Sequence, residues 1–455
     1  MMSRSFKLFG EKFTVTPIWV IIFFVVVLRI PTLFEPYWYG DEGIYLTLGQ
    51  AVRQGLVLYR DIFDHKPPLL YWFAAFAGNV FWFRFILLVW HAGTVVVFWK
   101  LAKGLFETNE KATLFSTSLF ALITTIPMFE GTIANAEIFM TLTTILAFYL
   151  LFSSTAPAKK LIYAGLLLSL SFLFKVPSIF DAGVIAFFWF VTDLNLKGIV
   201  STFRRGIILG LGFLVPILLT LLYYASRGAL KDYLNTAGVF NSSYIANWST
   251  PTASSSNALL AGGFSTRVLV FGALLFLIIL WRERLGRVGV FVTSWLVFSS
   301  FAMLLSGRPY PHYAIQVMPA LALAIAILAL GRERVRFLMV PFIGIFLSSL
   351  VFYKFYTFPT FSYYQNFLSF VMQRKTVQGY RGYFGEDVDR TYKLAAFLST
   401  RTTKRDRVFI WGTLPGVYAL SRRLPPVKYT TSFHIRDLGA EAETLEKLDQ
   451  ARPKY

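Results

Sequence analysis

Long apolar segments alternate with short polar connections along most of the chain. Eleven segments of about 15 to 23 mostly apolar residues are long enough to cross a ~30 Å hydrocarbon core as helices rising 1.5 Å per residue. They cover residues 17–34, 82–104, 112–128, 135–153, 161–175, 179–193, 206–226, 264–281, 287–306, 313–330 and 335–356. The pattern predicts eleven membrane-spanning helices, and the short pair 161–193 is also compatible with one re-entrant hairpin.

The connection 35–81 carries two further helical patterns. Apolar residues recur with helical spacing between Glu42 and Val52, and a second amphipathic pattern runs from Leu69 to Phe76 after Pro67-Pro68. We expect both helices to lie along the membrane interface, with the neighbouring tyrosines and tryptophans at headgroup depth. The connection 227–263 is instead rich in serine, threonine and asparagine, which predicts a mobile lid.

After residue 356 the pattern becomes that of a soluble segment. It predicts a small α/β domain over 357–455, with helices at 391–400, 415–420 and 440–451 and strands at 407–411 and 427–431. The chain ends where a further strand would be expected, so we expect the native protein to extend past Tyr455. Residues 1–356 form the predicted transmembrane domain.

Composition supports a membrane protein and excludes several other classes. Hydrophobic residues make up 56% of the 455 residues and charged residues only 15%, well below the ~25% of a soluble domain. The chain has no cysteine, which excludes disulfides and thiolate metal sites. Its net charge of +20 is spread over short clusters between apolar segments, which argues against nucleic acid as a partner.

The distribution of basic residues predicts the topology. If the N-terminus is inside, the connections predicted to be cytoplasmic carry fourteen lysines and arginines: Lys100, Lys103, Lys111, Lys159, Lys160, Lys197, Arg204, Arg205, Arg282, Arg284, Arg287, Arg332, Arg334 and Arg336. The short connections predicted to be outside carry two, Lys175 and Arg308. This asymmetry follows the positive-inside rule. It places the connections 35–81 and 227–263 and the segment 357–455 on the outer face of a cell membrane.

The connection 35–81 also holds the first group of candidate catalytic residues. Asp41 and Glu42 begin its first helix, where acids also favour the helix dipole without any further role. Adjacent helix positions do not share a face, so the two carboxylates are not expected to do the same job. Lys66 precedes two prolines that restrict its backbone, which suits it to an anionic phosphate; the alternative is contact with lipid headgroups. His65 is either a base or a polar residue at the rim.

A second group lies at the outer ends of later spans. Glu137 begins the fourth span, and an acid beside an apolar helix is a candidate functional residue. Lys175, Arg308, His312 and Tyr313 bring cations and a hydroxyl to the same face, where they could bind a phosphodiester or pyrophosphate group or anchor headgroups. There is no Walker loop, zinc-ligand spacing or GxSxG motif, which disfavours ATP-driven transport and serine hydrolase chemistry.

These motifs resemble those of the GT-C glycosyltransferases. The residues that carry the resemblance are Asp41-Glu42, Tyr45, Gly55, Tyr59, Lys66-Pro-Pro-Leu-Leu-Tyr71, Glu137, Lys175, Arg308 and His312-Tyr313. Within that fold the chain is most similar to the group related to ArnT and protein mannosyltransferases, which includes the RgtA/B/C/D-like domain. The resemblance covers essentially all of 17–356. The ArnT branch has a glutamate before the lysine where this chain has His65, so the resemblance does not carry over aminoarabinose or lipid A.

The resemblance implies a function and roles for individual residues. Such enzymes transfer a sugar from a polyprenyl-phosphate donor to a lipid, glycan or protein hydroxyl on the outer face of the membrane. It assigns the catalytic acid of the first outer loop to Asp41, the phosphate-contacting lysine to Lys66 and the second acid to Glu137. Glu42 and Glu137 stay open as alternative bases. If a divalent cation takes part, Asp41 and Glu137 are its candidate ligands.

The remaining predicted residues line the substrate cleft and the donor phosphate site. The cleft is assigned to Tyr45, Tyr59, Arg60, His65 and Tyr71, and the phosphate site to Lys66, Lys175, Arg308, His312 and Tyr313. A transporter or flippase of lipid-linked sugars is the competing interpretation. It predicts charges within the spans and internal repeats, whereas the polar groups here gather on one face and no repeat is visible.

Overall fold

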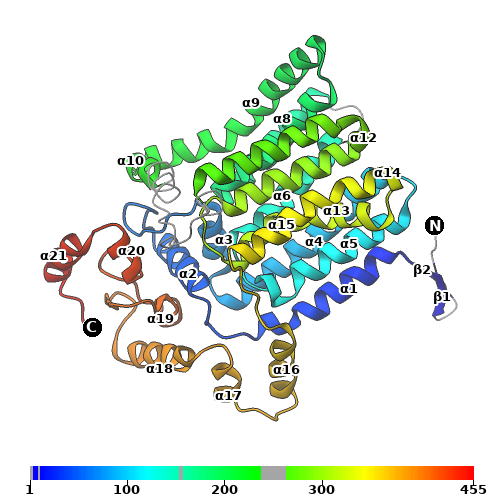
Figure 1. The fold of residues 1–455 in the computed structure, drawn as a ribbon. Coiled ribbons are helices and arrows are strands. Elements are labelled where there is room, and N and C mark those ends of the chain that lie inside the picture. The colour runs from blue at the N-terminus through cyan, green and yellow to red at the C-terminus, as the bar shows by residue number, and fades with distance from the viewer. Residues whose placement is uncertain (1–3, 9–10, 153–156, 237–262) are drawn as a thin grey trace, which may run out of the picture.

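The computed structural model describes residues 4–8, 11–152, 157–236 and 263–455. Its main body is a bundle of long helices that run side by side (Figure 1). The bundle helices are α1 (Pro17–Arg29), α4 (Val80–Phe106), α5 (Glu110–Thr125), α6 (Ala136–Phe152), α7 (Ala158–Phe174), α8 (Ile179–Thr192), α9 (Leu196–Ser226), α12 (Phe264–Leu304), α13 (Met318–Leu330) and α15 (Val340–Phe352). Short helical turns join them: η1 (Ile30–Leu33), η2 (Pro127–Phe129), η3 (Val176–Ser178), η5 (Pro311–Gln316), α14 (Glu333–Arg336) and η6 (Phe337–Met339).

Helix α12 accounts for two of the predicted spans. Gly286 inside it has φ 63° and ψ 178°, which is not helical and is readily reached only by glycine. The chain therefore breaks between the predicted spans 264–281 and 287–306. The pair 161–193 likewise forms two separate helices, α7 and α8. Every predicted span thus corresponds to a helix or half-helix, although four helices among the described residues are long and apolar enough by themselves to cross a membrane.

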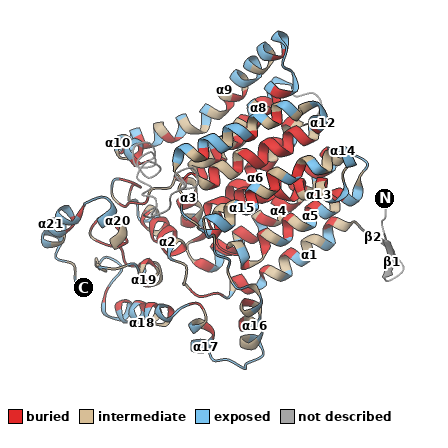
Figure 2. Ribbon diagram, in the orientation of Figure 1, coloured by how far each residue is buried: buried red, intermediate tan, exposed pale blue. Residues whose placement is uncertain are grey.

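Burial separates an interior from a lipid-facing surface (Figure 2). Phenylalanine, tryptophan and small residues from α4, α6, α8, α12 and α13 fill the centre of the bundle, among them the fully buried Phe148 and Trp295. Helix α9 instead exposes leucines along most of its length, including Leu211 and Leu222. Exposed leucine in such numbers is costly in water and favourable in hydrocarbon, which identifies the bundle as membrane-embedded. The number of spans and the position of the N-terminus inside stay predictions.

The connection between the first two bundle helices holds the predicted pair of helices. They are α2 (Gly40–Arg53) and α3 (Leu69–Ala77), as the amphipathic patterns predicted. Helix α2 is more deeply covered than an interfacial helix would be, because α3 packs on one side and α19 (Pro415–Ser421) on another. Tyr45 and Tyr71, one from each helix, are fully buried.

The C-terminal segment, residues 357–455, is helical. It contains α16 (Thr360–Val371), α17 (Val377–Gly382), α18 (Glu386–Arg401), α19, α20 (Ser432–Asp437) and α21 (Glu441–Ala451). The helices at 391–400, 415–420 and 440–451 are confirmed. No strand forms within 357–455, all of which the structure describes, so the predicted α/β character is wrong.

The two predicted strands remain single extended segments because neither finds a neighbouring strand to form a ladder. The amide of Val408 donates to the carbonyl of Leu424 over 3.2 Å, and the carbonyl of Lys428 accepts from the amide of Phe63 over 2.7 Å. Each is an isolated bridge. The only strands among the described residues are β1 (Arg4–Leu8) and β2 (Glu11–Val15), an antiparallel hairpin near the N-terminus.

The C-terminal segment packs against the connection 35–81 rather than standing apart from it. Helices α2, α3, α19 and α20 gather at one end of the bundle, and the β1–β2 hairpin lies at the other (Figure 1). Thr47 donates to the carbonyl of Pro415 over 3.2 Å, and Tyr392 accepts from the amide of Tyr37 over 3.3 Å. The predicted lid at 227–263 falls mostly outside the described residues; its first part forms α10 (Leu230–Leu234).

Candidate active site

The first acid of the outer connection forms an ion pair with the proline-flanked lysine. Asp41 lies in the first turn of α2, and its Oδ2 is 3.2 Å from Lys66 Nζ. Tyr45, one helical turn later, donates its hydroxyl to the same oxygen over 2.8 Å, and the Lys66 ammonium lies 4.9 Å from the centre of the Tyr45 ring. The Asp41 side chain keeps 35% of its surface exposed and Lys66 keeps 16%. The pair is therefore fixed on one side and open on the other.

Two tyrosine hydroxyls hold the backbone of Lys66. Tyr71 accepts from the Lys66 amide over 3.1 Å, and Tyr59 donates to the Lys66 carbonyl over 2.9 Å. Tyr59 itself has φ 75°, an unfavourable backbone conformation for a tyrosine that its buried surroundings maintain. Together with the two prolines that follow, these bonds leave Lys66 with little backbone freedom. Tyr45, Tyr59 and Tyr71 therefore position Lys66 and Asp41.

A second acid and lysine meet beside this pair. Glu137 at the start of α6 forms an ion pair with Lys175, which ends α7, and His312 Nε2 lies 3.8 Å from the same carboxylate oxygen. The Lys175 ammonium sits 3.7 Å from the centre of the Tyr313 ring. Glu137 exposes 1% of its side chain and Lys175 15%. The structure thus brings together four predicted residues, Glu137, Lys175, His312 and Tyr313, from three separate elements.

Three further polar residues complete the cluster and were not predicted. Glu130 Oε2 lies 2.5 Å from His312 Nδ1 and accepts the hydroxyl of Tyr39 over 2.8 Å. Asn135 donates to Tyr39 and accepts from Tyr45, each over 3.3 Å. Glu130 and Asn135 lie in the short outer connection before α6, a few residues ahead of Glu137. This closeness in sequence to a predicted site residue was the signal from which they could have been predicted.

Glu42 has a different role from its neighbour Asp41. Its carboxylate is buried, forms an ion pair with Arg84 of α4 and accepts the amide of Ala134 over 2.9 Å. Arg84 also lies 3.3 Å from Glu35, so one buried cation serves two carboxylates. This network connects α2 to α4 and to the connection before α6. The prediction that adjacent acids do different jobs is consistent with this geometry.

Electrostatics keep the Asp41–Lys66 pair charged. Burial works to raise the pKa of the Asp41 carboxyl, but Lys66 and His312 outweigh it and hold that pKa below its usual value. Burial likewise works to lower the pKa of Lys66, but the facing carboxylates Asp41 and Asp64 raise it overall. Burial raises the pKa of the Tyr45 hydroxyl well above its usual value, which keeps it a donor to Asp41. Asp41 is thus an ionised, partly exposed acceptor of protons.

Two further predicted residues, Arg60 and Arg308, are exposed at the surface. Arg60 is exposed, pairs with Asp61 at 2.7 Å and donates to the carbonyl of Arg227 over 2.7 Å, so it joins the outer connection to the end of α9. Arg308 is exposed four residues before His312.

His65 is directed toward the C-terminal segment. Its Nδ1 lies 3.0 Å from Asp64 Oδ1, and His434 Nε2 of α20 lies 3.3 Å from the same oxygen. Among the described residues this is the one group of three or more histidine and acidic side chains close enough to share a metal ion. Asp41 and Glu137 do not belong to it, because each faces a lysine instead.

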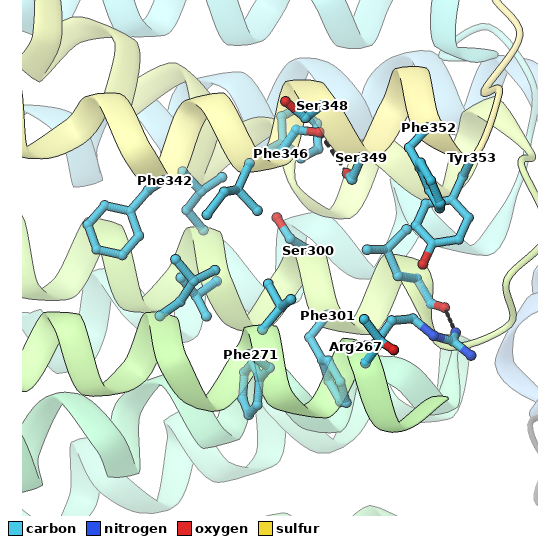
Figure 3. Close-up of a pocket in the computed structure, with 17 residues that line it drawn as sticks. Arg267, Phe271, Ser300, Phe301, Phe342, Phe346, Ser348, Ser349, Phe352 and Tyr353 are labelled. Carbon is cyan, nitrogen blue, oxygen red and sulfur yellow. Dashed lines mark hydrogen bonds between the residues drawn. The ribbon is translucent and has the colours of Figure 1, made fainter. Parts of the chain in front are cut away.

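An apolar cavity of about 360 Å³ lies elsewhere in the bundle, between the two halves of α12 and α15 (Figure 3). Phe271, Phe301, Phe342 and Phe346 line it, and Arg267 sits at one end with its guanidinium donating to the carbonyl of Leu305 over 3.1 Å. The cavity shares no lining residue with the polar cluster. Among the described residues that line it there is no carboxylate or histidine, the groups most often used as general acid or base.

Comparison with known proteins assigns the fold. No protein-family model matches the sequence, and no characterised protein matches it by sequence. ArnT from Cupriavidus metallidurans, solved with undecaprenyl phosphate bound, is similar in structure with a TM-score of 0.57 and 13% identity over 95% of this chain and 90% of ArnT. The oligosaccharyltransferase of Archaeoglobus fulgidus in its apo form gives a TM-score of 0.44 and 12% identity over 95% of this chain and 68% of its own.

The likeness to ArnT confirms the expected fold. The chain has the GT-C fold of membrane glycosyltransferases, and it is an integral membrane protein.

Proposed function

We propose that this protein is a glycosyltransferase that moves a sugar from a polyprenyl-phosphate donor to a hydroxyl group of a lipid, glycan or protein acceptor. The observation that carries the proposal is the partly exposed Asp41 carboxylate paired with Lys66 beside the Glu137–Lys175–His312 group. An acid that can take a proton and two cations that can neutralise a phosphate meet at one end of an apolar bundle. The fold shared with ArnT supports this assignment.

The two lysines form the donor phosphate site. Lys66 and Lys175 come from different elements, yet their ammonium groups are close enough to influence each other electrostatically, and each keeps a small exposed area. In the free protein both are neutralised by carboxylates. A donor phosphate would compete with Asp41 for Lys66, and charge-assisted contacts of this type contribute about 1.5–3 kcal/mol each. Binding of the phosphate therefore releases the Asp41 carboxylate from its ion pair.

Asp41 then acts as general base. It takes the proton of the acceptor hydroxyl as that oxygen attacks the anomeric carbon, while the bond from this carbon to the phosphate oxygen breaks and polyprenyl phosphate leaves. Asp41 is 35% exposed, whereas Glu137 and Glu42 expose 1% and 2% and are held by Lys175 and Arg84, so Asp41 is the carboxylate an acceptor can reach. One base without a covalent nucleophile gives inversion of configuration.

The two lysines disfavour a metal between Asp41 and Glu137. One oxygen of each carboxylate, Asp41 Oδ2 and Glu137 Oε1, already faces an ammonium group, from Lys66 and Lys175, while Glu137 Oε2 is buried without a hydrogen-bond partner among the described residues. A divalent cation there would lie near two positive charges, which raises the cost of binding it. No step of the proposed reaction runs through a metal at this position, and the cations Lys66 and Lys175 supply the charge stabilisation.

The site faces the outer side of the cell membrane in this proposal. Two arguments support that side: the asymmetric distribution of lysine and arginine along the connections, and the position of α2, α3 and the C-terminal segment at the bundle end opposite the N-terminal hairpin (Figure 1). A polyprenyl tail would then lie along the lipid-facing bundle, and its phosphate would reach the lysines at headgroup depth.

The test is donor-lipid binding in detergent, measured by native mass spectrometry with undecaprenyl phosphate as the probe. Lys66→Met keeps the aliphatic stem and removes the charge, so affinity should fall by roughly 10- to 100-fold, the equivalent of a charge-assisted contact. Lys447→Met is the matched control, because Lys447 is exposed on α21 and pairs with Glu443. Equal affinity for the wild-type protein and Lys66→Met would remove Lys66 from the phosphate site.

A second measurement separates a transferase from a transporter. The protein is reconstituted in vesicles with lipid-linked sugar extracted from its source membranes, and both transfer to an acceptor and movement between leaflets are followed. Transfer without movement supports the proposal. Movement without any covalent product would instead identify a flippase.

A further inference from the structure

Three side chains from two distant parts of the chain meet at the contact between the outer connection and the C-terminal segment. Asp64 and His65 precede Lys66, and His434 lies on α20. His65 Nδ1 is 3.0 Å and His434 Nε2 is 3.3 Å from Asp64 Oδ1, and the three donor atoms all lie within 4.8 Å of one another. The side chains of Asp64 and His434 are 1% and 3% exposed, and that of His65 is 20% exposed.

We propose that Asp64, His65 and His434 bind a divalent transition metal ion of the zinc type, which joins the outer connection to the C-terminal segment. Ligand bonds of about 2.0–2.2 Å in a tetrahedral site place the donor atoms roughly 3.3 Å apart, which is the spacing that two of the three pairs already have. Two imidazoles and one carboxylate suit zinc and its neighbours better than Mg²⁺ or Ca²⁺, which prefer all-oxygen sites. A fourth position stays open to water.

Neighbouring groups orient these ligands as outer partners do in metal sites. His434 Nδ1 lies 3.1 Å from the hydroxyl of Thr431, which leaves Nε2 directed at Asp64. Tyr71 donates its hydroxyl to Asp64 Oδ2 over 2.7 Å, and the amide of His65 donates to Oδ1 over 2.8 Å, so Oδ1 has one remaining lone pair for the metal. His434 Nδ1 and Asp64 Oδ2, the atoms that would not bind the metal, therefore already have hydrogen-bond partners.

The position of the site gives the metal a role distinct from the transfer reaction. Asp64 binds Tyr71, and Tyr71 in turn accepts from the amide of Lys66, so the proposed metal lies one side chain away from the backbone that holds the phosphate-binding lysine. Phe63, next to Asp64, donates its amide to the carbonyl of Lys428 in the C-terminal segment. A metal here would fasten the C-terminal segment over the connection and stiffen the Lys66 loop.

Metal content and affinity test the proposal without measuring sugar transfer. The purified full-length protein is stripped with a chelator, titrated with Zn²⁺ alone by calorimetry, and its metal content is measured by mass spectrometry. We expect one equivalent per chain, its loss in His434→Ala and in Asp64→Asn, and binding about 10- to 100-fold weaker in Thr431→Val, where only an outer partner is removed. Asp437→Asn, an exposed acid three residues from His434, is the matched control and keeps full binding.

The absence of cysteine from the chain permits a second test that does not depend on loss of binding. His434→Cys places a thiolate at the proposed ligand position, and loading with Co²⁺ should give a near-ultraviolet thiolate-to-cobalt charge-transfer band. Asp437→Cys, on the same helix but outside the cluster, should give none. Zinc uptake that is unchanged in His434→Ala, no stoichiometric uptake by the wild-type protein, or no cobalt–thiolate band in His434→Cys would each overturn the proposal. None of these outcomes bears on whether the protein transfers sugar.

Discussion

Asp41 differs from the other acids of the cluster in the exposed fraction of its side chain rather than in its charge. Asp41, Glu42 and Glu137 all have a basic partner within ion-pair distance, but only Asp41 keeps a third of its side chain exposed. A general base must reach the proton that it removes, and the pair with Lys66 leaves one face of the carboxylate open. Glu42 and Glu137 instead connect helices.

We expect Asp41→Asn to lower turnover by ~10²–10⁴-fold, because the amide keeps the shape of the side chain and loses its basicity. Donor binding should be kept or strengthened, because the phosphate no longer competes with a carboxylate for Lys66. Transfer is measured with purified protein and lipid-linked donor, and the anomeric configuration of the product by NMR. Asp61→Asn is the control, since Asp61 pairs with Arg60 away from the cluster. Retained configuration in the product, or full turnover in Asp41→Asn, would move the base to another carboxylate.

The pH dependence of phosphate binding follows from the same pair. The pKa of Asp41 lies below its ordinary 3.8 and that of Lys66 above its ordinary 10.5. The lowered acid contributes stability above pH 3.8 that is lost as pH falls through its folded pKa, and the raised lysine contributes stability below pH 10.5 that is lost as pH rises through its own. The affinity ratio between the wild-type protein and Lys66→Met should therefore stay constant from about pH 7.5 to 10, above the second ionisation of the phosphate monoester at about pH 6. A midpoint of this ratio inside that window would contradict the charge assignment.

The residues that could be predicted from the sequence are those whose own chemistry marks them in an apolar chain. Asp41, Lys66, Glu137, Lys175 and His312 were chosen as charged groups at the outer ends of spans, and the structure brings all five together. Their partners could not be assigned in advance. Glu130 meets His312 across 182 residues and Asp64 meets His434 across 370, and nothing in a single sequence records such pairings.

At the scale of elements, periodic patterns predicted helices well and extended segments poorly. Helices α2, α3, α18 and α21 follow apolar spacings that depend only on neighbouring residues. A strand depends on a partner, and Arg407–Trp411 and Val427–Thr431 each have the composition of one without a ladder to join. The error in the C-terminal segment therefore has a single physical cause, the absence of neighbouring strands.

The contact between α2 and α19 depends on one glycine, Gly43, that lets the backbones approach. A Cβ added at Gly43 would lie 2.8 Å from the amide nitrogen of Gly416, a backbone atom that cannot turn aside. We expect Gly43→Ala to destabilise this contact by about 1–3 kcal/mol and to expose the C-terminal segment to protease. Gly40→Ala is the matched control, because a Cβ there meets nothing within 4 Å.

Limited proteolysis in detergent, followed by mass spectrometry of the fragments, measures this effect. Faster cleavage within 400–455 in Gly43→Ala, with the wild-type rate in Gly40→Ala, is the expected pattern. Equal rates in all three proteins would mean that α19 does not depend on this close approach.

At the scale of the whole molecule, the arrangement in Figure 1 adds a geometric argument to the charge argument for topology. The connection 35–81 and the C-terminal segment share one end of the bundle and are bound to each other, so they must lie on the same side of the membrane. The basic turn α14 and the β1–β2 hairpin lie at the opposite end. The two ends of the bundle therefore face opposite sides of the membrane. Once the side of either terminus is known, the side of the active site is known as well.

We predict that residues 357–455 and the active site face outward and that the N-terminus faces inward. Fourteen basic residues in the connections at one end, against two in the short connections at the other, would have to be translocated in the inverted arrangement, which the positive-inside rule strongly disfavours.

A phosphatase reporter, which is active only when exported, should be active when fused after Tyr455 and inactive when placed in the 331–336 connection. The two fusions lie at opposite ends of one bundle. A reporter that is inactive after Tyr455 and active at 331–336 would invert the predicted topology and place the proposed reaction at the cytoplasmic leaflet. Activity at both positions would show instead that α15, the one predicted span between them, does not cross the membrane.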